Sequence, residues 1–314
     1  MGPENLTSVT EFILMGLTSH RKTQMVLFFI ILLIYLLTLA GNLVIIILVQ
    51  ANSSLHTPMY FFLTHLSGLE ICYVTSTLPQ MLAHLLSGNG AISFTRCIIQ
   101  MYIVLSLGAT ECLLLGVMAY DRYLAICHPL GYATAMGRWR QMHLASASWV
   151  GGFFFAMINV VCTLRFPFCG PNHLNHFFCE LPVVMKLACG DIQVTEAILF
   201  VVAVLIPLLL IPLSVILTSY GLILSSVLRM QSASVRHKAF STCASHLTVV
   251  TMFYVISLYM KPRSDTTPDS DKQTAVFYVV ITPLLNPIIY TLRNKEIHKA
   301  AAKMLPRKGL KEKY

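Results

Sequence analysis

Long apolar stretches recur along this chain, and the first of them, residues 25–49, contains no charged side chain. A helix rises about 1.5 Å per residue, so about 20 apolar residues cross the hydrocarbon core of a bilayer. Seven such stretches are present, at residues 25–49, 58–84, 97–126, 142–164, 194–228, 239–260 and 274–292. The sequence therefore predicts an all-α fold, a bundle of seven transmembrane helices.

Composition argues against a soluble or disordered protein. Apolar residues make up 56% of the chain and charged residues only 11%, whereas a soluble domain carries about 25% charged residues. The net charge of +9 can indicate nucleic-acid binding, but the positions of the basic residues favour membrane topology instead. We expect membrane lipid as a partner and no nucleic acid.

The basic residues also predict the orientation. With seven spans the termini lie on opposite sides, and the loops and tail on one side hold fourteen of the Lys and Arg residues against eight on the other. The richer side is cytoplasmic by the positive-inside rule. Asn5, in an Asn-Leu-Thr glycosylation triplet, is then extracellular. We expect an extracellular N-terminus at 1–24, a domain of seven transmembrane helices at 25–292 and a cytoplasmic tail at 293–314, in the plasma membrane.

Four cysteines fall on the predicted outer side: Cys97, Cys169, Cys179 and Cys189. An even number in an oxidising compartment predicts two disulfides, and the sequence leaves the three pairings open. His173, His176 and Cys179 also have the spacing of metal ligands. We favour a disulfide for Cys179 over a metal site.

Two carboxylates lie deep inside predicted spans, where charged groups are costly and indicate function. By the helical rise, Glu70 and Glu111 lie about 18 Å and about 16 Å from the same side of the membrane. Two ionised carboxylates cannot stay there unpaired, so the pair shares protons or holds a cation. We favour Na⁺, with Ser106 and Asn42 as polar neighbours. The alternative is two protonated glutamates bonded to helix backbone.

No nucleophile accompanies this carboxylate pair, so we expect no enzyme activity and no cofactor beyond Na⁺. Two further motifs lie near the predicted cytoplasmic side, Asp121-Arg122-Tyr123 and the segment from Asn286-Pro287 to Tyr290. Taken alone, the first is equally a topology anchor and the second a proline kink.

Several motifs follow one another in order over nearly the whole chain. They are Gly41-Asn42, PMYFFLTHLS from Pro58, MAYDRYLAICHPL from Met118, HFFCE from His176, Ser219-Tyr220, KAFSTCASHL from Lys238 and PLLNPIIYTLRNKE from Pro283. Together they resemble the olfactory receptors of the tetrapod-type class, within the class A G-protein-coupled receptors. One departure is Glu70, where the family usually has Asp.

The resemblance implies particular roles for individual residues. It implies disulfides Cys97–Cys179 and Cys169–Cys189. It also implies that Arg122 is released on activation to contact Tyr220 and a stimulatory olfactory G protein coupled to adenylyl cyclase. Tyr290 is the matching switch tyrosine, and a short amphipathic helix follows Arg293.

The resemblance also places an odorant site in the outer half of the bundle, although ordinary helix packing explains any single residue there equally well. We expect no carboxylate in that half, which favours a small, mostly apolar volatile ligand. An endogenous metabolite or lipid is the alternative ligand, and a transporter is disfavoured because no internal repeat is evident. The expected lining residues are Val104, Leu105, Gly108, Ala109, Cys112, Val202, Ala203, Ile206, Tyr254, Ser257 and Leu258.

Overall fold

The structure is a computed structural model, and it describes residues 10–168, 172–188, 209–229, 233–259, 268–292 and 295–304. Six residues named in the sequence analysis lie outside the described residues: Asn5, Cys169, Cys189, Val202, Ala203 and Ile206. For two more, Ser257 and Leu258, the structure describes the backbone but not the side chain. The roles expected for them stay predictions.

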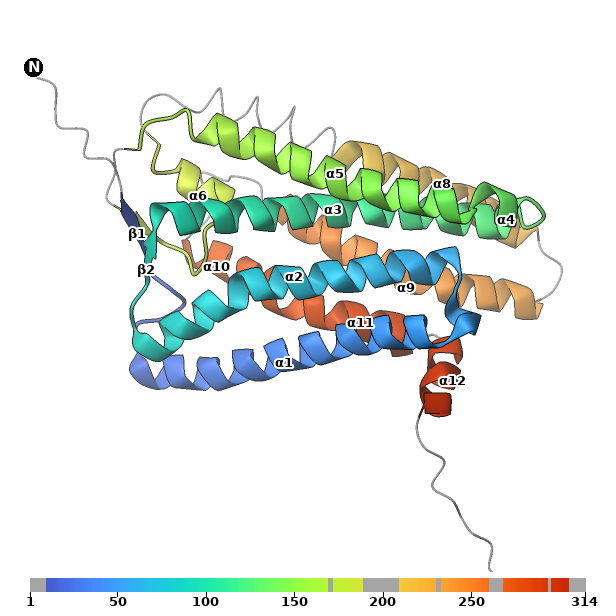
Figure 1. Cartoon of the computed structure of the whole chain (residues 1–314), viewed down its shortest axis with the longest axis horizontal. Coiled ribbons are helices and arrows are strands. Elements are labelled where there is room, and N and C mark those ends of the chain that lie inside the picture. The colour runs from blue at the N-terminus through green and yellow to red at the C-terminus, as the bar shows by residue number, and fades with distance from the viewer. Residues whose placement is uncertain are drawn as a thin grey trace, which may run out of the picture.

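Long helices run side by side and form one bundle (Figure 1). They are α1 (Arg21–Ala51), α2 (Pro58–Ser87), α3 (Phe94–Cys127), α5 (Arg138–Thr163), α8 (Ile211–Leu228) and α9 (Ala233–Tyr259), followed by a last column of α10 (Pro268–Val276), the π-helical turn η3 (Phe277–Ile281) and α11 (Thr282–Leu292). Within the described residues, five segments are long and apolar enough to cross a membrane by themselves. Each of the seven predicted stretches overlaps one of these helical segments, so the all-α fold is confirmed.

Several helices extend beyond their predicted boundaries. α1 begins at Arg21, four residues before the apolar stretch, and the Arg21 guanidinium donates to the carbonyl oxygens of Leu85 (3.1 Å) and Leu86 (2.6 Å) in the last turn of α2. α2 ends at Ser87 and is capped by Gly88, whose φ of +74° favours glycine. Hydropathy marks the lipid-embedded part of a helix, whereas hydrogen bonds and caps determine where it ends.

The π-helical turn η3 lies directly before Pro283, which has no N–H to donate. The Thr282 hydroxyl bonds back to the carbonyl oxygen of Phe277 (3.3 Å), and the Asn42 amide of α1 reaches the carbonyl oxygen of Pro283 (3.4 Å). The last column therefore remains helical through its prolines because side chains satisfy backbone groups there.

A three-stranded sheet closes one end of the bundle, called here the sheet end. The central strand β1 (Glu11–Leu14) pairs antiparallel with β2 (Ala91–Ser93) and parallel with β3 (His173–Leu174). The short helix α6 (Leu181–Met185) follows β3. The segment before α1 thus joins two loops that are distant in sequence.

The opposite end, called here the α12 end, carries the remaining short helices: η1 (Ser53–Leu55), α4 (Tyr132–Ala135) and α12 (Lys295–Met304) (Figure 1). α12 buries Ile297 and Ala300 against the bundle and exposes Lys299, which pairs with Glu296 (3.0 Å). It lies where the sequence predicts an amphipathic helix.

The bundle buries polar groups among its apolar core residues, and its outer surface is also apolar. α1 buries Thr38 and Asn42 but exposes Phe29, Leu33 and Leu36. Such an apolar outer surface is typical of helices whose solvent is lipid.

Helix contacts inside the bundle depend on small residues. A Cβ placed on Gly152 of α5 clashes with the Thr110 hydroxyl and lies 2.7 Å from the Thr110 nitrogen of α3. α3 and α5 therefore pack backbone to backbone at this point.

Candidate functional site

Glu70, Glu111 and Asn286 meet in the middle of the bundle, from α2, α3 and α11. All three side chains are buried. The Asn286 amide donates to a carboxylate oxygen of Glu70, and Glu111 lies close enough to interact with both the Asn286 amide and the Glu70 charge. The two carboxylates predicted at the same depth are thus neighbours in space.

Two oxygens of this acidic cluster are buried without a hydrogen-bond partner in the described part of the chain, Glu111 Oε1 and Asn286 Oδ1. Carboxylate and amide oxygens are ligands for small hard cations. Unpaired acceptors can equally be satisfied by a proton held on one carboxylate. The donor set therefore fits either Na⁺ or a shared proton.

The expected polar neighbours of the cluster, Ser106 and Asn42, are both buried. The Ser106 hydroxyl donates to the carbonyl oxygen of Tyr102 (2.7 Å), and the Asn42 amide donates to that of Thr38 (3.0 Å). Their role beside the cluster stays a prediction, and Asn286 is a further polar neighbour. Sequence analysis assigned Asn286 to the proline motif, because nothing in one sequence shows that the seventh column meets the second.

At the α12 end, Asp121 is buried beside Arg122. The Arg122 guanidinium lies 3.8 Å from one Asp121 oxygen, and the Tyr132 hydroxyl of α4 donates to the other (2.7 Å). Burial and the Asp121 charge raise the pKa of Tyr132, so its hydroxyl remains a donor. The next residue, Tyr123, pairs through its hydroxyl with the His128 ring (2.9 Å).

Tyr220 contacts His246 in this structure. The Tyr220 hydroxyl bonds His246 Nδ1 (2.7 Å) and the two rings stack with centroids 5.7 Å apart. The Arg122 charge acts on Tyr220, His246 and Tyr290 alike. Sequence analysis gave His246 no role, although it lies in the KAFSTCASHL motif.

Three polar atoms at this end are buried without a hydrogen-bond partner among the described residues: one guanidinium nitrogen of Arg122, Nε2 of His246 and the hydroxyl of Tyr290. Leaving buried polar groups unpaired is unfavourable. A different packing of α3, α9 and α11 could therefore give these three groups hydrogen-bond partners. Pro287 lies against α1, since a Cβ on Gly41 would approach its Cγ to 3.4 Å.

The predicted ligand residues on α3 and α9 lie together in part. Val104, Ala109 and Cys112 are buried on α3, and Leu105 packs in the apolar cluster near the sheet end. The Cys112 sulfur lies 3.4 Å from the Tyr254 hydroxyl of α9.

Gly108 leaves room beside α3 as far as the described residues show. No described atom lies within 4 Å of a Cβ built on Gly108. By helical spacing Gly108 lies on the same side of α3 as Glu111, one turn nearer the sheet end. Among the described residues, space therefore adjoins this side of α3, one turn from Cys112, which contacts Tyr254.

The sheet end adds a carboxylate that sequence analysis did not expect in the outer half. Glu180 is buried and accepts from the Tyr278 hydroxyl (2.7 Å), and its charge reaches Tyr73 of α2. It also lies 3.6 Å from the His176 ring. Burial and the charges of Lys272 and Lys186 lower the pKa of His176 to about 4, so at neutral pH this contact is not an ion pair.

A disulfide joins Cys97 of α3 to Cys179, and the Gln100 side chain accepts from the Cys179 amide (2.9 Å). The sulfur of Cys179 is consequently not free to ligate a metal with His173 and His176. Within the described residues, no group of three His, Cys, Asp or Glu side chains has the arrangement of a metal site.

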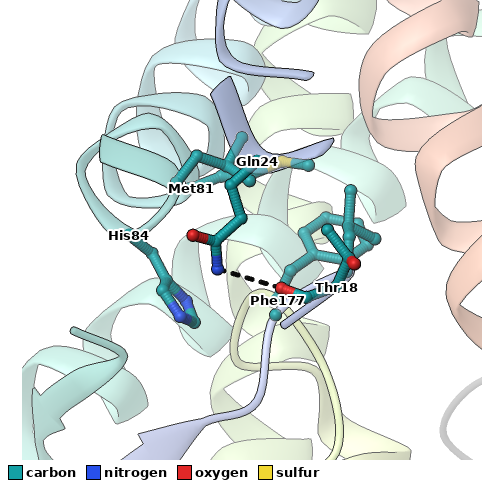
Figure 2. Close-up of a pocket in the computed structure, with 8 residues that line it drawn as sticks. Thr18, Gln24, Met81, His84 and Phe177 are labelled. Carbon is teal, nitrogen blue, oxygen red and sulfur yellow. Dashed lines mark hydrogen bonds between the residues drawn. The ribbon is translucent and has the colours of Figure 1, made fainter. Parts of the chain in front are cut away.

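Figure 2 shows a small pocket at the sheet end, away from the predicted ligand residues. Gln24 of α1 donates across it to the Thr18 carbonyl oxygen (3.0 Å), and His84, Met81 and Phe177 line it. Its volume of about 10 Å³ corresponds to about one water molecule. The pocket is therefore too small for an organic ligand.

Comparison with known proteins gives consistent matches. A family profile described as Olfactory receptor matches residues 31–308. Human Olfactory receptor 2G3 is 48% identical over 97% of this chain and 99% of its own length, and mouse Olfactory receptor 6B9 is 47% identical over 96% of each. The crystal structure of squid rhodopsin matches with a TM-score of 0.67 over 92% of this chain and 87% of that one, at 16% identity. The rhodopsin match shows a shared seven-helix fold.

Proposed function

This chain belongs to the olfactory receptor family, and on that premise we propose that it binds a small, mostly apolar volatile and activates a stimulatory heterotrimeric G protein, which raises cAMP. Members of this family are receptors, so the expectation of a non-enzyme agrees with the comparisons.

The observation that carries the ligand site is that no described atom lies within 4 Å of a Cβ built on Gly108. This space lies one turn from the contact between Cys112 and Tyr254, which joins α3 to α9. A ligand in this space touches both helices. Because a ligand shifts an equilibrium only by binding one state better than the other, it acts by favouring one packing of α3 against α9.

The same two helices carry the groups proposed to transmit the signal. α3 holds Arg122 and α9 holds His246, which now pairs with Tyr220. A shift of α9 away from α3 separates His246 from its surroundings and frees Arg122 for a partner. We place the G protein at this end, with Asp121, Tyr123, Pro287 and Tyr290 as the supporting residues.

The acidic cluster is proposed to hold Na⁺ between Glu70 and Glu111, with Asn286 as a further ligand. The unpaired oxygens of Glu111 and Asn286 support this assignment. An ion that binds one helix packing better than another stabilises that packing by mass action. Na⁺ thereby favours the inactive state.

The sheet end is proposed to face the outside of a plasma membrane. The disulfide between Cys97 and Cys179 supports this orientation, because disulfides persist in oxidising compartments. The basic residues of α12 and of the loops at its end of the bundle then face the cytoplasm.

A panel of chemically diverse volatiles, applied to cells that express the chain, tests the function. We expect at least one small apolar volatile to raise cAMP, with no response in cells that lack the stimulatory G protein subunit. Substituting Arg122 with Ala removes the response at equal surface expression. A volatile that raises cAMP equally in cells expressing the Arg122→Ala variant contradicts the proposed coupling.

A further inference from the structure

The start of α5 is an exposed basic and aromatic surface at the α12 end of the bundle (Figure 1). Its first three residues are Arg138, Trp139 and Arg140, and all three side chains are exposed. Trp139 is 74% exposed and stacks on His143 of the next turn, with ring centroids 4.5 Å apart and planes 27° from parallel.

Helical geometry places Trp139 and His143 on one side of α5 and one arginine on each flank of that side. Successive residues are about 100° apart, so Arg138 and Arg140 flank Trp139 on either side, while His143 lies above it. α5 buries Ala145, Ser148 and Gly152 against the bundle. Trp139 and His143 fall on the opposite side, which faces lipid.

No charge on the described part of the chain neutralises this surface. The first turn of α5 contains no acidic residue. The ion pairs found at this end involve other groups, Arg122 with Asp121 and Lys299 with Glu296. Two guanidinium groups are thus free to bind an external anion.

The position of these residues at the edge of the membrane indicates which anion they bind. Trp is enriched where the hydrocarbon meets the headgroups, because its ring is amphipathic. The apolar stretch of α5 that is predicted to cross the membrane begins at residue 142, three residues after Trp139. The two arginines are therefore level with lipid phosphates, and guanidinium groups bind phosphate in a bidentate manner.

We propose that the start of α5 is a binding site for the headgroup of an anionic phospholipid of the cytoplasmic leaflet. Arg138 and Arg140 attract the headgroup from the two flanks of Trp139, and the stacked rings of Trp139 and His143 contact the upper part of the acyl chains. The assignment to the cytoplasmic leaflet rests on the proposed orientation, whereas the headgroup preference does not.

The chain contains only two tryptophans, Trp139 and Trp149, so Trp139 can report on its own lipid neighbours. The Trp149→Phe variant leaves Trp139 as the only indole. The purified receptor is placed in nanodiscs of phosphatidylcholine that contain, at equal mole fraction, either phosphatidylserine or phosphatidylcholine with brominated acyl chains. Bromine quenches indole fluorescence on contact, so quenching measures which lipid lies beside Trp139.

We expect stronger quenching by brominated phosphatidylserine, with a local enrichment on the order of fivefold for each arginine. The Arg138→Gln/Arg140→Gln variant loses the preference. The matched control is Arg229→Gln, which removes an exposed arginine from the end of α8 at the same end of the bundle and keeps the preference. Inorganic phosphate added at constant ionic strength does not displace the lipid.

Three results overturn the proposal: equal quenching by the two lipids, an unchanged preference in the double variant, or an equal loss in Arg229→Gln. Displacement by inorganic phosphate overturns the lipid assignment in favour of a free anion. If Trp149→Phe does not fold, the difference in quenching between the wild type and Trp139→Phe gives the same quantity. The experiment uses neither an odorant nor a G protein, so its failure and that of the proposed function are separate outcomes.

Discussion

Replacing Gly152 with Ala tests the close contact between α5 and α3. The new methyl group clashes with the Thr110 hydroxyl and lies 2.7 Å from the Thr110 nitrogen and 2.8 Å from the Ser106 carbonyl oxygen. Ordinary contact begins at 3.4 Å, so α3 and α5 must separate by about 0.6–0.7 Å at this level. The Thr110 hydroxyl also donates to the Ser106 oxygen (2.8 Å), and the methyl group disturbs this bond.

Because two of the opposing atoms belong to the backbone, the cost is at the upper end of the range for overpacking, about 3 kcal/mol. In a protein of this size that lowers the melting temperature by about 6 °C. The assay is the thermal unfolding of purified receptor in detergent, followed by a thiol-reactive or intrinsic fluorescence signal, together with surface expression in cells.

The neighbouring glycine is a matched control. A Cβ on Gly151 meets only the terminal methyl of Leu113, at 3.1 Å, and this flexible end can rotate away. Alanine also has the better helix propensity, by about 1 kcal/mol. We expect Gly151→Ala to melt within about 2 °C of the wild type. Equal melting of the two variants would refute the packing of α5 against α3 described above.

Three further predictions concern the acidic cluster and the sheet end. We expect the wild type to melt at a higher temperature in NaCl than in choline chloride. Glu111→Gln abolishes this difference because one carboxylate ligand is lost. A difference that survives in the variant rules out Na⁺ at this site. Stability is constant above about pH 7 and falls as the pH decreases from 6.5, the usual pKa of histidine, towards 4, because the unfolded chain takes up a proton that buried His176 does not. His176→Gln flattens this part of the pH profile of unfolding, and an unchanged profile assigns the effect to another group. Cys97→Ser opens a bridge between residues 82 apart and costs about 4 kcal/mol, seen as lost surface expression and a lower melting temperature; unaltered melting would mean that the bridge contributes nothing.

The sequence predicts the helices well because lipid imposes a simple rule on them. Apolar runs of about 20 residues identify the spans, and the depth of Glu70 and Glu111 follows from the rise of a helix. Both inferences are local, since each depends on one helix and on the thickness of the membrane.

Contacts between helices are not local, and the sequence alone did not predict them. Asn286 meets Glu70 across 216 residues, and His246 meets Tyr220 from another helix. β1 joins two loops through backbone hydrogen bonds that carry no side-chain signature. Glu180 lies in a loop, and outside a span hydropathy does not predict how deep in the protein a residue lies. To predict any of these contacts, one must know which helices are neighbours. The hydrophobic periodicity of a single sequence does not carry that information.

The most direct test of the proposed signalling site is to fill the space beside Gly108. With a volatile that raises cAMP in the wild type, dose–response curves are compared for Gly108→Leu and for Gly221→Leu, at matched surface expression. Gly221 is an exposed position of α8, and a Cβ placed on it likewise has no described atom within 4 Å. The account predicts that Gly108→Leu abolishes the response or shifts the curve at least tenfold, by about 1.4 kcal/mol of lost binding or more, while Gly221→Leu responds like the wild type. An unshifted curve for Gly108→Leu would contradict it.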